Sequence, residues 1–379
     1  MRMKVFLNVI VASLISFTLS VSASAQGTVS PITFSFDFRN GPLGWQAGFA
    51  DYPPSTDDGA YGLRAELRDL PPELGVSGTG FYFQGWNGSD DLFMFMKRRL
   101  GPSDGIVAGQ AYWLDFTIVL ASNAQTCGGI GGLPGESVLV KVGGSPAEPR
   151  TLFDTLKPSP HLRMNIDKSN QSQSGIAASV AGNIQTGQPC NPNSAPYFSI
   201  QHTHRHIVPV LANSSGELWL LLGTDSGFEG FTSLYYQRVD VRLTPLSAPP
   251  PPKLLTTRNW EGNDTGRAAA LDSVTLTGEP FSILTTRNFS SDQHTRLILL
   301  AYDMELRSEE DSSVIEVQAE DSQQKVYPLA VEAVRHVPNF EWITQLVVRL
   351  PIELRNAGDV SISVKLRGMP SNKALVRLN

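Results

Sequence analysis

The sequence predicts an all-β protein built from two β-sandwiches in tandem. Glycine and proline are abundant, with 33 and 26 residues among 379, whereas only 17% of the residues are charged. Short runs rich in Val, Thr, Phe and Tyr alternate with these turn-forming residues, which is typical of strands joined by tight loops. The length is sufficient for two domains that each bury a core.

We expect residues 1–25 to be a signal peptide. Arg2 and Lys4 precede an apolar run, and the small residues Ala23–Ala25 form the pattern that a signal peptidase cleaves. No later segment reaches the roughly 18 uninterrupted apolar residues that a membrane-spanning helix needs. The sequence therefore predicts a secreted protein, periplasmic or extracellular, without a membrane span.

The charge pattern and the cysteines give further indications about the partners and the compartment of the protein. The formal net charge is −6 with both signs interspersed, so no basic stripe indicates a nucleic acid as partner. The two cysteines, Cys127 and Cys190, lie in loops rich in Gly or Pro, and an oxidising compartment favours their pairing. We predict one disulfide, and in the chain-entropy model a loop of about 60 residues would contribute on the order of 4 kcal/mol.

A run of four prolines at 249–252 predicts the domain boundary, because proline cannot join a sheet and favours an extended spacer. We assign residues 30–246 to a first domain, 247–253 to the linker and 254–379 to a second domain. In the second domain Val360, Ile362 and Val364 share one face of a strand. Seven or eight such short strands predict a sandwich.

The last third of the chain resembles an immunoglobulin-like domain of large secreted bacterial surface proteins. The positions that carry the resemblance are Leu350, Pro351, Gly358, Asp359, Val360, Ser371 and Asn372. The resemblance implies a spacer or adhesive module, and it brings no catalytic residues.

The first domain resembles jelly-roll carbohydrate-binding modules, which open with an aromatic strand and a Gly-Trp pair. The matching positions are Phe36, Phe38, Gly44, Trp45, Tyr236, Asp240 and Val241. The loop-rich segment that runs from about residue 145 to about residue 196 is interpreted as an insertion. The resemblance implies a carbohydrate or other cell-surface ligand and, in many such modules, a structural calcium ion.

The segment FYFQGWNGSDD supplies the candidate binding residues Tyr82, Trp86, Asn87, Asp90 and Asp91. Aromatic rings can cover the apolar face of a sugar while nearby carboxylates and amides bond its hydroxyls. The alternative is a plain strand, after which Trp86 fills the core.

Calcium would take oxygen ligands from acidic turns, for which Asp225, Glu229 and Asp240 are candidates. Asp and Gly are also ordinary turn residues, so these positions can equally be structural.

The stretch FSIQHTHRHIVPV predicts a strand that projects His202, His204 and His206 from its more apolar face, together with Val208 and Val210. Histidines two apart lie about 6.5–7 Å from each other and could share one zinc ion, but the ends of the row are about 13 Å apart. We favour a hydrogen-bonded or stacked row that lines a concave face over a zinc site, and the three histidines are therefore candidate ligand-binding residues.

Local motifs for catalysis are weak. GPSDG at 101–105 matches the pattern of a nucleophile elbow, but Pro102 and the strand-like segment that follows are the wrong context. Paired carboxylates for glycoside hydrolysis leave no local spacing and stay open. We expect a non-catalytic protein that binds carbohydrate or another extracellular ligand. The alternatives are a structural or adhesive surface protein and a metal-dependent hydrolase or lyase that uses the histidines.

Overall fold

The computed structural model describes residues 30–55, 59–88, 91–155, 160–259, 262–287, 290–307 and 309–379. The predicted signal peptide and the candidate Asp90 lie outside these residues. The described chain is nearly all β, so the predicted fold class is confirmed. Five short 3-10 helices occur within it: η1 (Phe38–Asn40), η2 (Pro72–Leu74), η3 (Pro102–Asp104), η4 (Ser312–Val314) and η5 (Ile352–Leu354).

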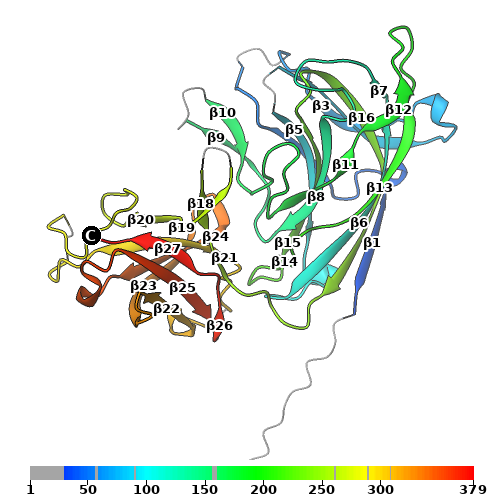
Figure 1. Ribbon diagram of the computed structural model, residues 1–379. Coiled ribbons are helices and arrows are strands. Elements are labelled where there is room, and N and C mark those ends of the chain that lie inside the picture. Colours follow the sequence, from blue (N-terminus) through cyan, green and yellow to red (C-terminus); the bar gives the residue numbers. More distant parts are fainter. Residues whose placement is uncertain are drawn as a thin grey trace, which may run out of the picture.

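The residues before the prolines form a first sandwich of two sheets (Figure 1). Sheet 1 has the order β13 (Phe198–Arg205), β6 (Ala111–Ser122), β16 (Gly230–Pro245), β4 (Thr79–Asn87) and β3 (Arg64–Asp69), with β1 (Ile32–Asp37) beside β16 and β14 (Val210–Leu211) beside β6. Sheet 2 has the order β11 (Ala178–Asn183), β8 (Val138–Ser145), β15 (Leu218–Ser226), β5 (Leu92–Leu100) and β2 (Gln46–Ala50).

The core of the first sandwich follows from strand alternation. Phe81 and Phe83 on β4, Phe116 on β6 and Leu222 on β15 point inward and are buried. Burial of such side chains stabilises the fold by about 2 kcal/mol each. The residues of the other parity face outward, which leaves sheet 1 and sheet 2 with one outer face each.

Two small strand pairs lie outside these sheets. β7 (Ala124–Thr126) runs parallel to β12 (Gln185–Pro189), and Cys127 and Cys190, which follow them, form a disulfide with their Cα atoms 4.8 Å apart. The predicted disulfide is thus confirmed. The hairpin of β9 (Thr151–Asp154) and β10 (His161–Met164) belongs to the segment interpreted as an insertion.

The part of this segment before β11 covers the outer face of sheet 2, whereas β11 is an edge strand of sheet 2 itself and so belongs to the sandwich. Met164 and Ile166 pack there against Phe93 and Phe95 of β5 and Leu221 of β15. Residues of sheet 2 that would face solvent in a bare sandwich are therefore buried, which creates a second, smaller core.

The residues after the prolines form the second sandwich. Its strands follow the order β17 (Lys253–Leu254), β21 (Arg296–Tyr302), β24 (Phe340–Arg349), β23 (Val326–Val337), β22 (Ile315–Glu320), β25 (Asp359–Leu366), β27 (Ala374–Arg377), β19 (Asp264–Ala268) and β18 (Thr256–Arg258), with β20 (Ala270–Asp272) beside β21 and β26 (Met369–Pro370) beside β25. Val360, Ile362 and Val364 are buried in its separate core, as their alternation predicts.

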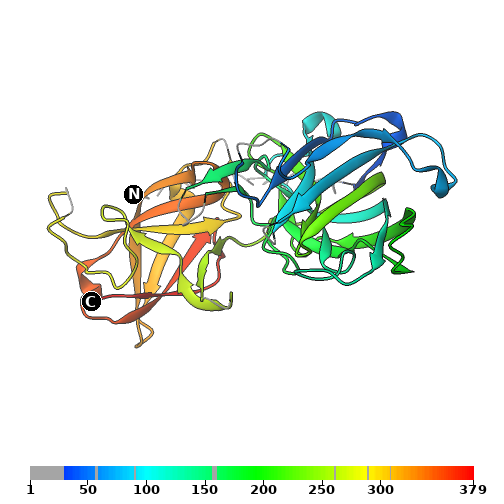
Figure 2. The same cartoon turned by 90° about the horizontal axis from the view of Figure 1, so that it is seen from above.

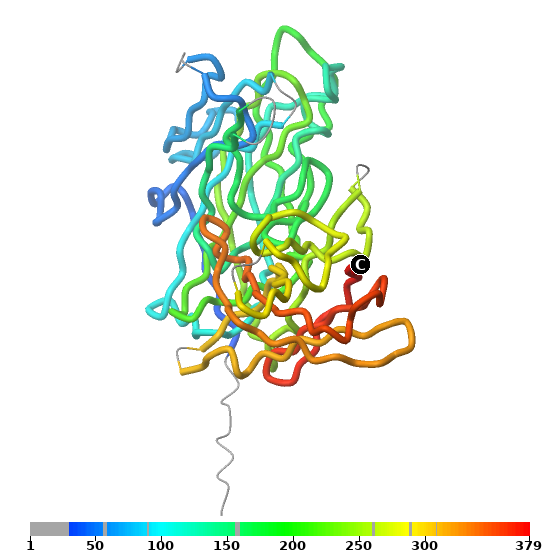
Figure 3. Tube along the Cα trace, turned by 90° about the vertical axis from the view of Figure 1, so that its left-hand side faces the viewer, coloured from blue at the N-terminus to red at the C-terminus, as the bar shows by residue number. Residues whose placement is uncertain are grey.

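The two sandwiches form two lobes that are visible from the side and from above (Figures 1 and 2). Figure 3 views the molecule from the side of the second sandwich. Trp342 of β24 joins the lobes, because its ring packs on the core under the insertion and its Nε1 donates to the carbonyl of Asn165 at 2.9 Å. Arg150 and Glu341 add an ion pair at 2.9 Å. Within the described residues, no helix has the length and apolar character needed to cross a membrane.

Candidate functional sites

The candidate residues of the first sandwich separate into three places. Tyr82 and Trp86 lie on the outer face of sheet 1, while Asn87 at the end of β4, Asp91 before β5 and Asp225 of β15 lie at one end of the sandwich. The three histidines lie between the edge strands of the two sheets.

The outer face of sheet 1 carries a cluster of tyrosines. The rings of Tyr82 and Tyr235 lie with centroids 4.8 Å apart, and Tyr197 meets Tyr235 at 5.2 Å. The Arg68 guanidinium lies 4.7 Å from the centroid of Tyr82, and the Tyr197 hydroxyl is 2.7 Å from the Ser233 hydroxyl. Burial raises the pKa of Tyr197 to about 12. Tyr82 is only 4% exposed, so its place in the structure is within this cluster rather than at an open surface.

Trp86 has a different environment from Tyr82. It is 49% exposed, so the alternative in which it fills the core is wrong. Phe231 of β16 lies directly opposite Trp86 in the strand register and is 50% exposed. Side chains opposite each other in an antiparallel pair have Cβ atoms about 5 Å apart. We call the two residues the aromatic platform.

Polar groups border the aromatic platform. Gln84, two residues before Trp86 on the same face, accepts a hydrogen bond from the Tyr82 hydroxyl at 2.7 Å and donates to the carbonyl of Gly62 at 2.8 Å. Arg64 of β3 lies opposite Gln84 and is exposed. Two exposed rings beside an amide and a guanidinium can cover an apolar ligand face and bond its hydroxyls.

The end of sheet 2 holds six ionic side chains that we call the charged cluster: Asp51, Asp91, Lys141, Arg163, Lys168 and Asp225. Asp225 of β15 is fully buried and receives both Lys141 and Lys168 at 2.8 Å. Lys168 also lies 2.8 Å from Asp51. Arg163 joins Asp51 at 3.3 Å to Asp91 at 2.8 Å. The three carboxylates balance the three cations.

The two lysines of the charged cluster also bond backbone carbonyls. Lys141 donates to the carbonyls of Lys168 and Gln173 and pairs with Asp225, whereas Lys168 donates to the carbonyl of Ser169 and to Asp225. Burial lowers the pKa of Lys141, although Asp225 opposes this effect. Burial also acts against the charged form of Lys168, but the charges of Asp225, Asp51 and Asp91 outweigh it and raise the pKa of Lys168.

Asp91 differs from the other carboxylates of the charged cluster. Burial, followed by the charge of Asp51, raises the pKa of Asp91 to about 6. Its position is fixed by Asn87, which is 1% exposed and whose Oδ1 accepts the amide N–H of Asp91 at 3.2 Å. A cavity of about 400 Å³ opens beside Asp51, Asp91, Arg163 and Lys168. We call it the charged cavity.

The candidate calcium ligands do not gather. Asp225 is held by two lysines, whereas Asp240 of β16 accepts from the Ser35 hydroxyl at 2.6 Å and pairs with Arg238 at 3.0 Å. Glu229 follows sheet 2 in a loop that bridges to Ile130. Among the described residues no group of three or more His, Cys, Asp or Glu side chains could hold a metal ion. The calcium prediction draws no support from these contacts.

The histidines occupy the open edge of the first sandwich, where β13 of sheet 1 faces β11 of sheet 2. His202 donates from Nε2 to the carbonyl of Asn183 at 2.7 Å. His204 Nε2 and His206 Nδ1 lie 2.8 and 2.9 Å from the Ser179 hydroxyl, and His206 Nε2 donates to the carbonyl of Ile176 at 2.8 Å. Each histidine is therefore hydrogen-bonded across to the partner sheet.

These contacts fit a neutral His206 that carries its proton on Nε2. Its Nε2 donates to the Ile176 carbonyl, and its Nδ1 then accepts from the Ser179 hydroxyl, whose oxygen accepts from His204 Nε2. This arrangement requires a neutral His206, whereas His204 donates from Nε2 in either protonation state. In agreement with it, burial lowers the pKa of the fully buried His206 to about 4.

The strand predicted to carry the histidines extends further along the chain than the strand in the structure. The three rings share a face as expected, but β13 ends at Arg205, and Val210 belongs to the separate strand β14. Pro209 accounts for the break, because proline lacks the N–H that a continuous ladder requires.

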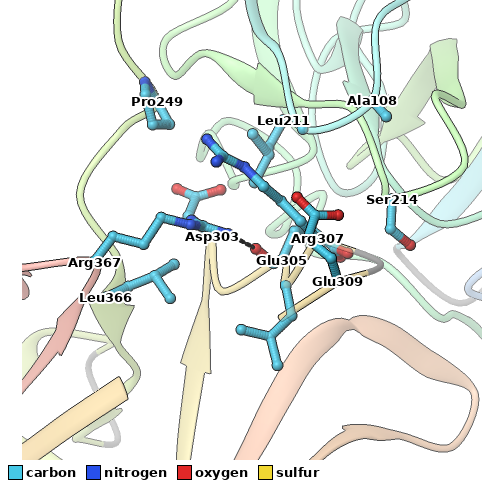
Figure 4. A pocket seen from close by; sticks show the side chains of 12 residues that line it. Ala108, Leu211, Ser214, Pro249, Asp303, Glu305, Arg307, Glu309, Leu366 and Arg367 are labelled. Carbon is cyan, nitrogen blue, oxygen red and sulfur yellow. Dashed lines mark hydrogen bonds between the residues drawn. The ribbon is translucent and has the colours of Figure 1, made fainter. Parts of the chain in front are cut away.

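A further cavity lies between the sandwiches (Figure 4). Its volume is about 250 Å³, and it has Leu211 and Ser214 of the first sandwich on one side and Asp303, Glu305 and Arg367 on the other. Burial raises the pKa of Asp303 to about 7, opposed by Lys253 and supported by Glu305. Burial raises the pKa of Glu305 as well, while His336 and the amide N–H of Ser214 act in the opposite direction.

No protein-family model matches the chain, and no curated protein matches its sequence.

Proposed function

We propose that the protein is a secreted, non-catalytic carbohydrate-binding protein whose ligand rests on the aromatic platform of Trp86 and Phe231. The observation that carries the proposal is the exposure of two large rings opposite each other on adjacent strands. Exposed rings of this size cost solvation free energy, which a bound sugar ring would recover by covering them.

The surroundings of the aromatic platform support a sugar rather than a purely apolar partner. Gln84 and Arg64 border the rings, and a sugar presents hydroxyls that such side chains can bond. The disulfide is compatible with an oxidising, extracytoplasmic compartment, in line with secretion. The hydrolase alternative draws no support from the histidines, since the Nε2 atom of each and the Nδ1 atom of His206 already bond Asn183, Ser179 or Ile176.

The test is a glycan array with the full chain, followed by calorimetry on the glycans that bind. We expect Trp86→Ala and Phe231→Ala each to weaken binding by about tenfold, the equivalent of 1.4 kcal/mol. Phe153→Ala is the matched control, because Phe153 is 57% exposed but lies on the hairpin over sheet 2. Equal affinities for the three variants would contradict the proposal that the ligand rests on the aromatic platform. An array without any bound glycan would favour the structural or adhesive alternative.

A further inference from the structure

A cleft of about 780 Å³ separates the inserted segment of the first sandwich from strands β17, β18 and β24 of the second. Its volume lies in the range of ligand pockets, and ligand sites occur preferentially at domain interfaces. We call it the interdomain cleft. It is distinct from the aromatic platform, which lies on the outer face of sheet 1.

The second sandwich supplies aromatic surface to the interdomain cleft. Tyr302 and Trp342 both line it, with ring centroids 6.4 Å apart. The hydrogen bond from Trp342 to the carbonyl of Asn165 holds the indole in one orientation before any ligand arrives. A fixed ring loses little conformational entropy on binding, so it contributes more of its contact energy to affinity.

The first sandwich supplies small polar groups to the interdomain cleft. Ser169, Asn170 and Gln173 line that wall, and they offer both hydrogen-bond donors and acceptors. Among the described lining residues the charges balance, because Asp167 and Asp264 oppose Lys253 and Arg258. A nucleic acid or another polyanion would need a basic surplus, which these residues do not provide.

The interdomain cleft adjoins the charged cavity, because Asp167, Ser169 and Asn170 line both. Polar and charged side chains therefore extend beyond the interdomain cleft on the side of the turn at 167–170. A ligand longer than the interdomain cleft would meet these groups next.

We propose that the interdomain cleft is a second ligand site, and that it binds a neutral oligosaccharide that contacts both sandwiches at once. Two rings on one wall and hydroxyl, amide and balanced ionic groups on the other are the chemistry that recognises an uncharged, hydroxyl-rich chain. The proposal goes beyond the aromatic platform and rests on residues that the platform does not use.

The test uses the full chain with Trp86→Ala and Phe231→Ala already in place, so that only the interdomain cleft can bind. The probes are the neutral hexasaccharides of cellulose, xylan, mannan and chitin, with hexagalacturonate as the acidic comparison, measured by calorimetry. We expect one or more neutral hexasaccharides to bind and hexagalacturonate to bind at least tenfold more weakly. Absence of binding by all four neutral probes would overturn the proposal and leave the aromatic platform untouched.

Two exposed side chains allow matched variants in the same background. Asn170→Ala and Arg258→Ala should each weaken neutral-hexasaccharide binding by about tenfold, the loss expected when a ligand hydrogen bond is removed. The controls are Asn193→Ala and Arg355→Ala, whose side chains are equally exposed but do not line the interdomain cleft. Equal affinities for the variants and their controls would place the ligand elsewhere and contradict the proposal.

A separate measurement tests whether the ligand contacts both sandwiches at once. A ligand that bridges the sandwiches should slow proteolysis of the linker at 246–253, because it restrains their relative motion. A ligand held by one sandwich would leave the cleavage rate unchanged. Binding without linker protection would therefore also contradict the bridging geometry.

Discussion

The two sandwiches differ most in what they bury. In the first, Asp51, Lys141, Lys168 and Asp225 are all less than one-tenth exposed. Among the described residues of the second, the buried polar side chains are only the hydroxyls of Thr295, Thr344 and Ser363. Since buried ion pairs seldom add stability over apolar packing, the first sandwich carries polar chemistry that its fold does not require.

This contrast indicates that the first sandwich depends on buried charge more than the second does. The second sandwich follows plain strand alternation, and the side chains of its ion pairs keep some exposure to solvent. The first sandwich holds the exposed rings, the charged cluster and the histidine row. Variants that remove one ionic or titratable group should therefore have large effects in the first sandwich and small effects in the second.

The largest effect is expected for Asp225→Ala. The change leaves Lys141 and Lys168 buried with Asp51 as the remaining contacting carboxylate. Removal of one partner from a buried pair typically costs about 3–5 kcal/mol, because it leaves an uncompensated charge. Urea unfolding of the two proteins measures the difference.

The milder Asp225→Asn keeps the shape of the site if the alanine variant does not fold. It should still lose more than about 1 kcal/mol, because the amide cannot neutralise two ammoniums. A free energy of unfolding equal to that of the unchanged protein would show that the charged cluster is not a closed ionic unit.

The charged cluster also shows where sequence reasoning fails. The all-β class, the disulfide and the shared face of the histidines were predictable, because they depend on local alternation and loop composition. Lys141 alternates with Val140 and Val142, so its strand pattern predicts a solvent-facing lysine. Residues from the segment before β11 cover that face, and the alternation of residues within β8 gives no sign of this cover.

The aromatic platform was only half predictable for a similar reason. Trp86 stands out beside polar residues, but its partner Phe231 comes from a strand far along the chain. A local signal did exist, since Phe231 occupies the outward parity of β16 while Leu234 and Tyr236 face the core. An apolar residue at an outward position indicates either coverage or a binding surface.

The second largest effect concerns pH and the histidine row. The pKa of His206 is lowered to about 4 in the folded protein from its ordinary value of 6.5, so the unfolded chain binds the extra proton first. Stability from this residue is complete above pH 6.5 and is lost as the pH falls toward 4, by roughly 3 kcal/mol in total. Urea unfolding at a series of pH values measures this loss.

The histidine prediction has its own control. His206→Gln cannot titrate, so its stability should change less between pH 6.5 and 4 than that of the unchanged protein. An identical pH slope in both proteins would mean that another group causes the acid loss, and the neutral hydrogen-bond chain through Ser179 would need revision.

An effect of opposite sign is expected at the contact between the sandwiches, and it is smaller within the assayed range, because pH 5.5 to 8 covers only the upper half of the interval between the two pKa values of Asp303. The pKa of Asp303 is raised to about 7 from an ordinary 3.8, so its contribution is present below pH 3.8 and is lost as the pH rises through 7. Ionised Asp303 and Glu305 repel each other in the cavity of Figure 4, while Lys253 and His336 face them. The linker at 246–253 should therefore be cleaved faster at pH 8 than at pH 5.5.

Asp303→Asn serves as the matched variant, assayed with the same protease at both pH values. The ratio of the two cleavage rates should fall toward the ratio that the protease shows on an unstructured peptide. A ratio unchanged by the substitution would assign the pH dependence to Glu305 or to another part of the contact.

The smallest effect is expected for Asp359→Ala, the counterpart of Asp225→Ala in the second sandwich. Asp359 is 42% exposed and lies 2.8 Å from Arg267, which also pairs with Glu279 and so keeps a carboxylate partner after the change. Water screens such a pair, and exposed pairs are typically worth under about 1 kcal/mol. Urea unfolding in low and high salt measures the size of the loss and its dependence on salt. Even this small loss should shrink in high salt, because salt screens the charges. A loss as large as that of Asp225→Ala would show that the two sandwiches depend on ionic contacts alike, and the contrast between buried and exposed charge would lose its physical basis.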